Sequence, residues 1–283
     1  MSRAAPGLPN VLWIGGAPRS GKTTIAKRIA RFHGLRWYNA DAHTWEHRDR
    51  ALAAGNAAAL RWEAMTPEER WVRSTPAEQL ELSLHAERGP MVVDDLRRLP
   101  RSPLTVAEGS PVSPAVVSAG IAAASHAVWL IPTAELQRGR LPEVGWPAEL
   151  AVLLAATIER DAIEHEAPIL TVDGSRGLDE MMTAVEEVFA AALAEGPRAV
   201  TASERLALLR YANEAVVSQC LAYLARPWTS GDAESMVRTF VCECDDPECD
   251  LPLELSVAAF QRAAANGPVL AGFHDATSGR RAR

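Results

Sequence analysis

The chain has 283 residues, 48% of them hydrophobic and 23% charged, which predicts a globular protein of about two domains and excludes a disordered chain. Acidic residues outnumber basic ones, 36 to 29, for a net charge of −7, and the basic residues are all Arg except Lys22 and Lys27. A mildly acidic chain without a basic tail is not expected to bind nucleic acid, because that affinity comes largely from neutralised phosphates.

Short apolar runs, each followed by residues at helical spacing, predict alternating strands and helices over the first two thirds of the chain. The strands are expected at residues 10–15, 35–39, 103–107, 127–131 and 168–172. The helices are expected at residues 21–33, most of 44–100, 114–124, 148–166 and 178–193, with a loop over 132–147. Gly34 ends the first helix, and Thr66 and Thr75, each followed by Pro and an acid, are predicted N-caps. This alternation indicates an α/β fold with a parallel sheet.

The pattern changes at Gly196, where we place a boundary between a first domain, residues 1–196, and an accessory domain, residues 197–283. The second domain is expected to be small and α+β. Its elements are predicted as a helix over 203–224, a strand over 237–242, a helix over 255–265 capped by Ser256, and a last strand over 269–272.

Residues 16–23 match the phosphate-loop pattern G-x-x-x-x-G-K-[ST] and lie between a strand and a helix, as the pattern requires. The N–H groups of such a loop turn toward phosphate oxygens, its lysine bridges two phosphates, and its last hydroxyl ligates Mg²⁺. The positive end of the next helix faces the same anion. The predicted nucleotide-binding residues are Gly16, Ala17, Pro18, Arg19, Ser20, Gly21, Lys22, Thr23 and Thr24.

Residues 8–195 resemble the P-loop small-molecule and nucleotide kinases, such as shikimate, gluconate and adenylate kinases. The resemblance rests on this loop, an acid after the second strand, an acid-Gly pair after the third, an Arg-bearing loop after the fourth and a DGS turn after the fifth. It implies a kinase core whose five-stranded parallel sheet has the order 2-3-1-4-5. It also implies ATP and Mg²⁺ as cofactors, transfer of the γ-phosphate to a small acceptor, and a lid over the site.

Asp41 follows the second strand, at the edge where parallel sheets bind ligands. Its carboxylate can take the proton of an acceptor hydroxyl, as an Asp at this place does in similar kinases, or it can cap the following helix. His43, His47, Arg48 and Arg50 come next, at helical spacing. They are candidates for binding an acidic or phosphorylated acceptor, and the alternative is a solvated helix start with its own ion pairs.

Half of the eight tryptophans, Trp37, Trp45, Trp62 and Trp71, lie in this acceptor-side region. They either line an aromatic pocket or form ordinary helical core, and the sequence leaves both alternatives open.

Glu108 follows the third strand, where related folds carry an acid that serves Mg²⁺ or acts as a base. Asp94 and Asp95 are rivals for this role, because residues 91–95 also resemble a strand that ends in acids. We prefer Glu108, because residues 84–99 continue a helical pattern.

The loop after the fourth strand carries Arg138 and Arg140, the expected lid arginines that neutralise charge on the transferring phosphoryl group. The alternative is that both are surface residues. Ser175, in the turn after the fifth strand, lies where the adenine ring rests in related folds, and a plain β-turn explains it equally well.

Cys242, Cys244 and Cys249, together with His274, supply four ligands of the kind that Zn²⁺ binds tetrahedrally. The spacing differs from common zinc knuckles, so the alternative is a group of reduced thiols with a local structural or redox role. A zinc site would help hold together a small domain with a poor core.

The sequence therefore predicts a phosphotransferase that moves the γ-phosphate of ATP–Mg²⁺ to a hydroxyl or phosphate of a small-molecule acceptor. Lys22, Asp41, Glu108, Arg138 and Arg140 are the expected catalytic residues. The alternative function is a regulatory nucleotide-binding switch whose C-terminal domain binds a partner. Apolar runs fall short of the roughly 20 residues that span a bilayer, and the first residues lack the apolar core of a signal peptide, so a cytoplasmic protein without a membrane partner is expected.

Overall fold

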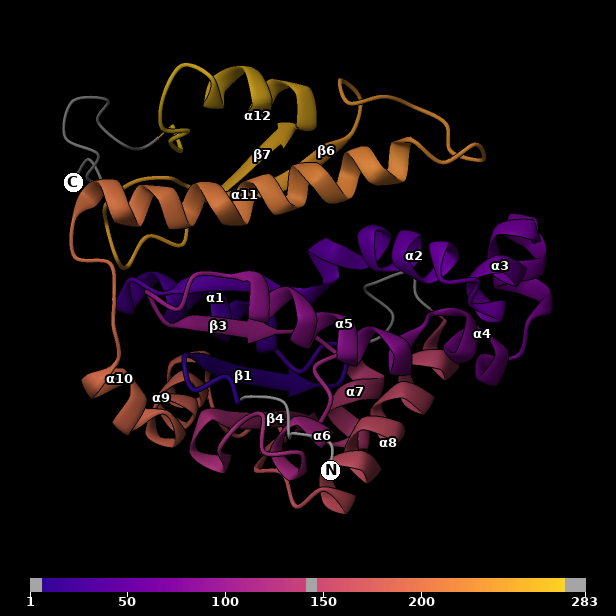
Figure 1. Ribbon diagram of the computed structural model, residues 1–283, viewed down its shortest axis with the longest axis horizontal. Helices are drawn as coiled ribbons and strands as arrows, with labels where there is room; N and C mark the ends of the chain where they lie inside the picture. Colours follow the sequence, from indigo (N-terminus) through magenta and orange to yellow (C-terminus); the bar gives the residue numbers. More distant parts are fainter. Residues whose placement is uncertain (1–6, 141–146, 273–283) are drawn as a thin grey trace.

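A parallel sheet of five strands forms the centre of the molecule (Figure 1). The structure is a computed structural model, and it describes residues 7–140 and 147–272. The strands are β1 (Val11–Gly16), β2 (Arg36–Asn39), β3 (Thr105–Glu108), β4 (Ala127–Pro132) and β5 (Ile169–Val172). They lie in the order β2-β3-β1-β4-β5, and every pair is parallel. The predicted α/β class, strand positions and strand order are confirmed.

Helices cover both faces of this sheet, and each face has its own hydrophobic cluster. One face is covered by α1 (Lys22–His33), α9 (Leu178–Val188) and α10 (Ala190–Glu195). The other is covered by α5 (His85–Arg98), α6 (Ala115–Ser118) and α8 (Ala148–Glu164). Because the central strands are buried on both faces, their sequences are continuous apolar runs and not alternating ones.

The helix α1 begins at Lys22, within the last residues of the phosphate-loop pattern, and is closed by a glycine. Gly34 closes it with φ 68° and ψ 43°, a left-handed conformation that glycine adopts without strain. Ile25 and Ile29 are fully buried against the sheet. The local sequence therefore sets the length and the buried face of the helix that carries the loop.

A helical segment joins β2 to β3. Its elements before α5 are η1 (Ala40–His43), α2 (Thr44–Ala53), α3 (Ala57–Ala64), η2 (Glu69–Arg73) and α4 (Pro76–Leu82). The predicted cap at Thr75 is confirmed, since its hydroxyl accepts from the N–H of Glu78 and the Glu78 carboxylate accepts from the Thr75 N–H. Thr66 makes the same reciprocal bonds with Glu69.

Asp94 and Asp95 lie within α5, so the strand that residues 91–95 resemble does not form. The acid that ends a strand beside β1 is Glu108, as preferred from the helical spacing. Two expectations need correction. The helix expected over 114–124 is limited to the single turn α6 (Ala115–Ser118), and the segment expected as a loop over 132–147 contains the helix α7 (Ala134–Arg140).

The chain beyond Gly196 forms a layer over the core, drawn in orange and yellow in Figure 1. Its elements are α11 (Ala202–Leu224), β6 (Val237–Val241), β7 (Pro252–Ser256) and α12 (Val257–Ala264). Strands β6 and β7 form an antiparallel hairpin, and Ser256 caps α12 as predicted. Two details were wrong: β7 was not expected as a strand, and residues 269–272 form no strand.

This C-terminal layer is packed closely on the core. Helix α11 contacts β2, η1 and α2 as well as β6. At the expected boundary, the N–H of Leu104 donates to the carbonyl of Pro197 (2.8 Å), and a side chain at Gly196 would collide with Leu104. Residues 197–201 therefore do not behave as a loose linker. Within the described residues, no helix is both long and apolar enough to cross a membrane.

Candidate functional site

The carboxyl ends of the five strands meet at one edge of the sheet, and the predicted site residues follow those ends. Glu108 lies opposite Ile14 of β1 on one side and Asn39 of β2 on the other. The phosphate loop, Asp41, Glu108 and the start of α7 therefore lie along the same edge, where ligands of parallel α/β sheets bind.

The phosphate loop is a tight turn with three residues of positive φ: Gly16 (135°), Arg19 (65°) and Gly21 (88°). The loop is tied to β4, because the N–H of Ala17 donates to the carbonyl of Leu130 (3.3 Å). A Cβ atom at Gly16 would lie 2.3 Å from that same carbonyl oxygen, so this position requires glycine. Such a turn directs backbone N–H groups into one concavity, which suits a phosphate.

The N-terminus of α1 opens onto this loop without a capping side chain and without an acid in its first turn. Lys22 is buried, and its Nζ donates to the carbonyl of Ala17 (3.3 Å). The buried hydroxyl of Ser20 has no hydrogen-bond partner among the described residues. Uncapped N–H groups, a lysine and an unpaired hydroxyl are together suited to an anion.

Thr23 and Glu108 form the polar floor of the loop. The Thr23 Oγ1 donates to Glu108 Oε2 (3.1 Å), while the buried Oε1 has no partner within the described part of the chain. Burial raises the pKa of Glu108 to about 7, against the opposing effect of Lys22. A hydroxyl and a carboxylate at this spacing are oxygen ligands of the kind that Mg²⁺ prefers.

Asp41 is exposed at the same edge, in η1. Among the described residues, α2 has no capping side chain, so the structure shows no cap by the Asp41 carboxylate. Asn39 supplies the capping oxygen of η1 by accepting from the Asp41 N–H (2.8 Å). Arg88 of α5 faces it, with Nη2 3.8 Å from Asp41 Oδ1. The carboxylate is therefore accessible to a ligand and has a cation behind it.

His47 is fully buried and holds Arg88 in place. Its Nδ1 accepts from Arg88 Nε (3.2 Å), and its Nε2 lies 2.9 Å from Asp95. Arg88 Nη2 also donates to the carbonyl of Ala40 (2.6 Å). An Nδ1 acceptor requires a neutral ring. Burial lowers the pKa of His47, and the Arg88 charge adds to this effect, against the hydrogen bond to Asp95, which raises the pKa. His47 thus positions a cation, while His43 stacks on Tyr38 nearby.

Two predicted acceptor-binding arginines have partners within the fold. Arg48 is buried, donates to the carbonyl of Leu82 (2.7 Å) and lies over the ring of Trp62. Arg50 pairs with Asp95 (2.8 Å). The tryptophans also divide, because Trp45 and Trp62 pack with Trp228 while Trp71 is exposed. The contact of Arg48 or Arg50 with an acceptor stays a prediction.

Arg88 and His85 are candidate site residues that the sequence prediction missed. Both come from the first turn of α5, and burial lowers the pKa of His85 to about 4, with Arg88 the next cause. One signal was present, because Arg88 occupies an apolar position of the helical pattern between Leu84 and Val92. A charged residue in a buried stripe indicates a specific partner.

On the far side of the loop, α7 carries Arg138, which is exposed. Arg140 ends the same helix, and its side chain lies outside the described part. The N–H and hydroxyl of Ser175 both donate to Asp173 Oδ1, at 2.9 and 2.6 Å. These two bonds stabilise a local turn at residues 173–175, and a contact of Ser175 with adenine stays a prediction.

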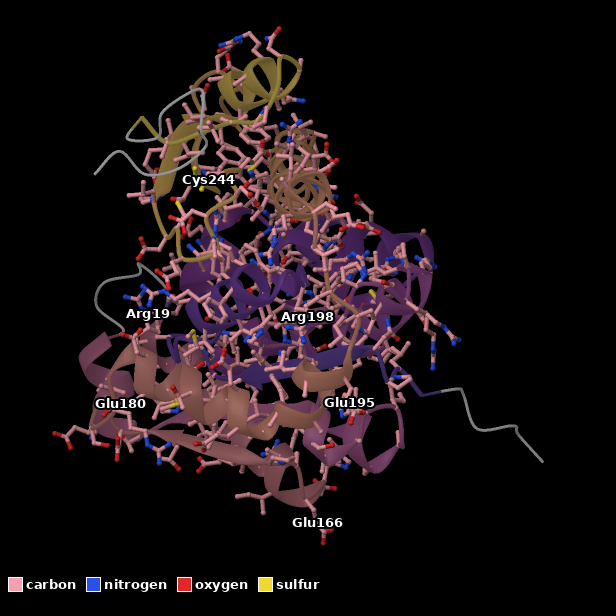
Figure 2. The ribbon with its side chains drawn as sticks, turned by 90° about the vertical axis from the view of Figure 1, so that its left-hand side faces the viewer. Arg19, Glu166, Glu180, Glu195, Arg198 and Cys244 are labelled. Carbon is pink, nitrogen blue, oxygen red and sulfur yellow. The ribbon has the colours of Figure 1, made fainter. Side chains whose placement is uncertain are left out.

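A second cluster lies in the C-terminal layer. The sulfur atoms of Cys242, Cys244 and Cys249 are buried and lie within 4.8 Å of one another, so they can hold a metal ion. Figure 2 shows Cys244 between the C-terminal layer and the core, apart from Arg19 of the phosphate loop. His274, the predicted fourth ligand, lies outside the described residues.

The acid between the first two cysteines has a structural role. Glu243 is buried and receives two hydrogen bonds from Arg210, both 2.7 Å, together with one from Asn213 (3.0 Å) and one from the N–H of Val269 (2.8 Å). Glu243 joins the segment that carries the cysteines to α11, and both of its carboxylate oxygens accept hydrogen bonds. The three sulfur atoms are therefore the available ligands here.

A comparison of the sequence with models of protein families and with curated proteins found no match. The function is therefore argued from the loop, the sheet edge and the side chains gathered there.

Proposed function

We propose that the chain is an ATP-dependent phosphotransferase that moves a γ-phosphate to a small-molecule acceptor. The observation that carries the proposal is the buried Glu108, hydrogen-bonded to Thr23 beneath an uncapped α1 and Lys22. Glu108 Oε1 and Ser20 Oγ are buried without partners among the described residues. Buried polar atoms are normally paired, so both fit a site completed by a ligand.

In this proposal the loop N–H groups of residues 16–24 and Lys22 hold the phosphates, and Thr23 and Glu108 hold Mg²⁺. When bound, ATP–Mg²⁺ supplies the phosphoryl group and most of the charge neutralisation. Burial of Lys22 beside the loop keeps its charge directed at the phosphates and limits water. Arg138, exposed on α7 at the same edge, is the proposed arginine that neutralises charge on the transferring phosphoryl group.

Asp41 is the proposed acceptor-side residue. Its exposed carboxylate accepts the hydrogen bond of an acceptor hydroxyl and takes its proton as attack proceeds. Arg88 orients this carboxylate, because the buried guanidinium is itself fixed by His47 and the Ala40 carbonyl. Nucleosides, sugars, nucleotides and antibiotics with free hydroxyls are the acceptor classes to test.

The experiment is a screen of these acceptors for ATP consumption by the full-length protein with Mg²⁺. For the acceptor found, Lys22→Ala should lower turnover about 100-fold or more, and Asp41→Asn should lower kcat by roughly 10²–10⁴-fold without weakening ATP binding. Arg73→Ala, which breaks an exposed ion pair with Glu68 in the helical segment between β2 and β3, is the control. Full turnover by Lys22→Ala would end the proposal, and full turnover by Asp41→Asn would end the role of Asp41 alone.

A nucleotide-dependent switch is the second candidate, favoured by the contact of α1 with the cysteine segment through Arg31. The same screen separates the two functions. A switch hydrolyses ATP slowly at one rate whatever acceptor is present, whereas a phosphotransferase depends on the acceptor.

We further propose that the ion held by Cys242, Cys244 and Cys249 is Zn²⁺, with a structural role in the C-terminal layer. Thiolates are preferred zinc ligands, and the cluster forms part of the small hydrophobic core around Phe240 and Phe260. Metal analysis of the purified protein should find about one zinc per chain. Its loss in Cys249→Ser would support the site, and zinc-free wild-type protein would refute it.

A further inference from the structure

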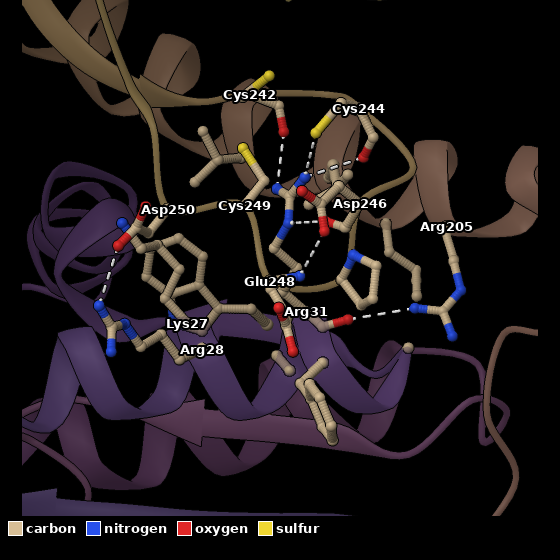
Figure 3. Close-up of a pocket in the computed structure, with 18 of the residues that line it drawn as sticks. Lys27, Arg28, Arg31, Arg205, Cys242, Cys244, Asp246, Glu248, Cys249 and Asp250 are labelled. Atoms are coloured by element: carbon tan, nitrogen blue, oxygen red, sulfur yellow. Dashed lines mark hydrogen bonds and ion pairs between the residues drawn. The ribbon is translucent and has the colours of Figure 1, made fainter. Parts of the chain in front are cut away.

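The helix that carries the phosphate loop reaches the cysteine cluster at its other end. Arg31, in the last turn of α1, points into the segment from Cys242 to Asp246 (Figure 3). Its Nη1 donates to the carbonyl of Cys242 (2.7 Å) and its Nε to that of Asp246 (2.8 Å). Its Nη2 donates to the carbonyl of Cys244 (2.9 Å) and to the Cys244 sulfur (2.8 Å).

These bonds give Arg31 two effects on a metal ion held by the cysteines. First, the guanidinium fixes three backbone carbonyls, and it thereby fixes the spacing of the two ligands Cys242 and Cys244. Second, it donates to a ligand sulfur directly. Three thiolates around a divalent ion leave a net negative charge in a buried place, and a cation bonded to one sulfur offsets it.

A weaker contact joins the same two elements nearby. Arg28, one turn earlier in α1, pairs with Asp250 (3.0 Å) and with Asp179 (3.1 Å). Both contacts involve exposed or half-exposed carboxylates and touch neither a sulfur nor a carbonyl of the ligand segment. Such a pair contributes little. Arg28 and Arg31 also line one cavity of about 400 Å³ beside the cluster.

We propose that Arg31 completes the metal centre from outside its ligand set, so that a bound zinc ion fastens the C-terminal layer to the phosphate-loop helix. The inference rests on the zinc site proposed above and is independent of phosphate transfer. It makes Arg31 a positioning residue, since it acts on the metal through Cys244 and the ligand backbone. The centre then belongs to both layers of the molecule, although all three cysteines come from one.

The first experiment is a competition titration of Zn²⁺ against a chromophoric chelator, with full-length protein. Arg31→Ala should weaken zinc binding about 10–100-fold, the usual effect of losing a partner of a ligand. Arg31→Lys keeps the charge but loses the fork, so its affinity should fall between those of Arg31→Ala and wild type. Arg28→Ala is the matched control on the same helix and should stay within about twofold of wild type.

The second experiment follows amide hydrogen exchange with and without zinc. In wild type, removing zinc should speed exchange at residues 27–33 of α1 as well as at 242–250. In Arg31→Ala, residues 27–33 should no longer respond to zinc, while 242–250 still should. This difference separates fastening from mere folding of the cysteine segment.

Equal zinc affinity in wild type and Arg31→Ala would overturn the inference, as would zinc-independent exchange at residues 27–33 of wild type. A wild-type protein that binds no zinc would refute the centre itself, which is a different result. Circular dichroism checks that each variant is folded, and if Arg31→Ala is not, Arg31→Lys decides. An affinity for Arg31→Lys equal to that of wild type would then count against the role of the guanidinium fork.

Discussion

Two buried charged residues, Arg88 and Glu108, lie at the carboxyl edge of the sheet, where the proposed site is. Arg88 is 8% exposed and has three partners, His47, the Ala40 carbonyl and Asp41. Glu108 is fully buried and keeps one oxygen without a partner in the described structure. A paired charge is stable in the interior, whereas an incompletely paired one costs free energy. A cation bound at the unpaired oxygen of Glu108 would therefore stabilise its charged form.

Glu108→Gln should remove a pH dependence of stability in nucleotide- and Mg²⁺-free protein. The folded pKa of Glu108, about 7, lies above the ordinary value of 4.5. Between those pH values the folded protein keeps a proton that the unfolded chain has released, so rising pH destabilises the folded state. The shift corresponds to about 3 kcal/mol, fully present above pH 7. Urea unfolding from pH 5 to 8 should show the variant gaining stability relative to wild type. Parallel curves would contradict the shifted pKa.

At the scale of elements, α1 contacts the phosphate loop, the sheet and the cysteine segment. Its first turn meets the phosphate loop, its buried face packs on the sheet, and Arg31 in its last turn holds the cysteine segment. Gly16 and Gly34 permit the chain to turn at the entry to the loop and at the exit from the helix. A single rigid helix therefore joins both candidate sites.

Gly16→Ala should destabilise the protein more than Gly21→Ala. Both glycines have positive φ, so either alanine is strained by about 1–2 kcal/mol. Only at Gly16 does the new Cβ meet backbone, 2.3 Å from the Leu130 carbonyl oxygen, while nothing lies within 4 Å of it at Gly21. Denaturant unfolding of the two variants measures the difference. Equal losses would mean that the loop moves away from β4 without cost.

At the scale of the whole molecule, α11 joins the C-terminal layer to β2, η1 and α2 of the core. It lies against the edge strand β2, which covers an edge that would otherwise be open to pairing with another chain. Beyond its end, Trp228 packs among Trp45, Trp62 and Tyr223, and its indole donates to Glu63 (3.2 Å). The helices α2 and α3 are therefore held by residues nearly 170 positions away.

Trp228→Ala should cost roughly 3 kcal/mol of stability, because it opens a cavity within this aromatic cluster. It should also speed amide exchange in α2 and α3, far along the chain from the substitution. Trp71→Ala is the control, since Trp71 is 48% exposed, and it should change stability by about 0.5 kcal/mol or less. If both variants behaved alike, the cluster would not hold the two layers together.

The order of the strands was expected only from the resemblance to P-loop kinases. The sequence by itself determined the α/β class, the positions of the five strands, and the caps at Thr75, Gly34 and Ser256. These features depend on short-range patterns: apolar runs, helical spacing and motifs within a few residues. The strand β7 was not predicted, because its last residues were assigned to the helix that follows. A two-strand hairpin with one exposed face gives a weak signal over five residues.

Only the tertiary structure decided which partners the buried charged residues have. In the sequence, Arg48 and Arg50 could not be distinguished from ligand-binding arginines. In the structure, Arg48 lies over Trp62 and Arg50 pairs with Asp95. Arg88 was not predicted as a site residue, because its partner Asp41 is brought near it only by the packing of α5 beside η1. Arg31 meets Cys244 across 213 residues of chain. Local sequence sets the conformation of a segment, but the partner of a buried charge depends on which elements pack together, and that is a property of the whole fold.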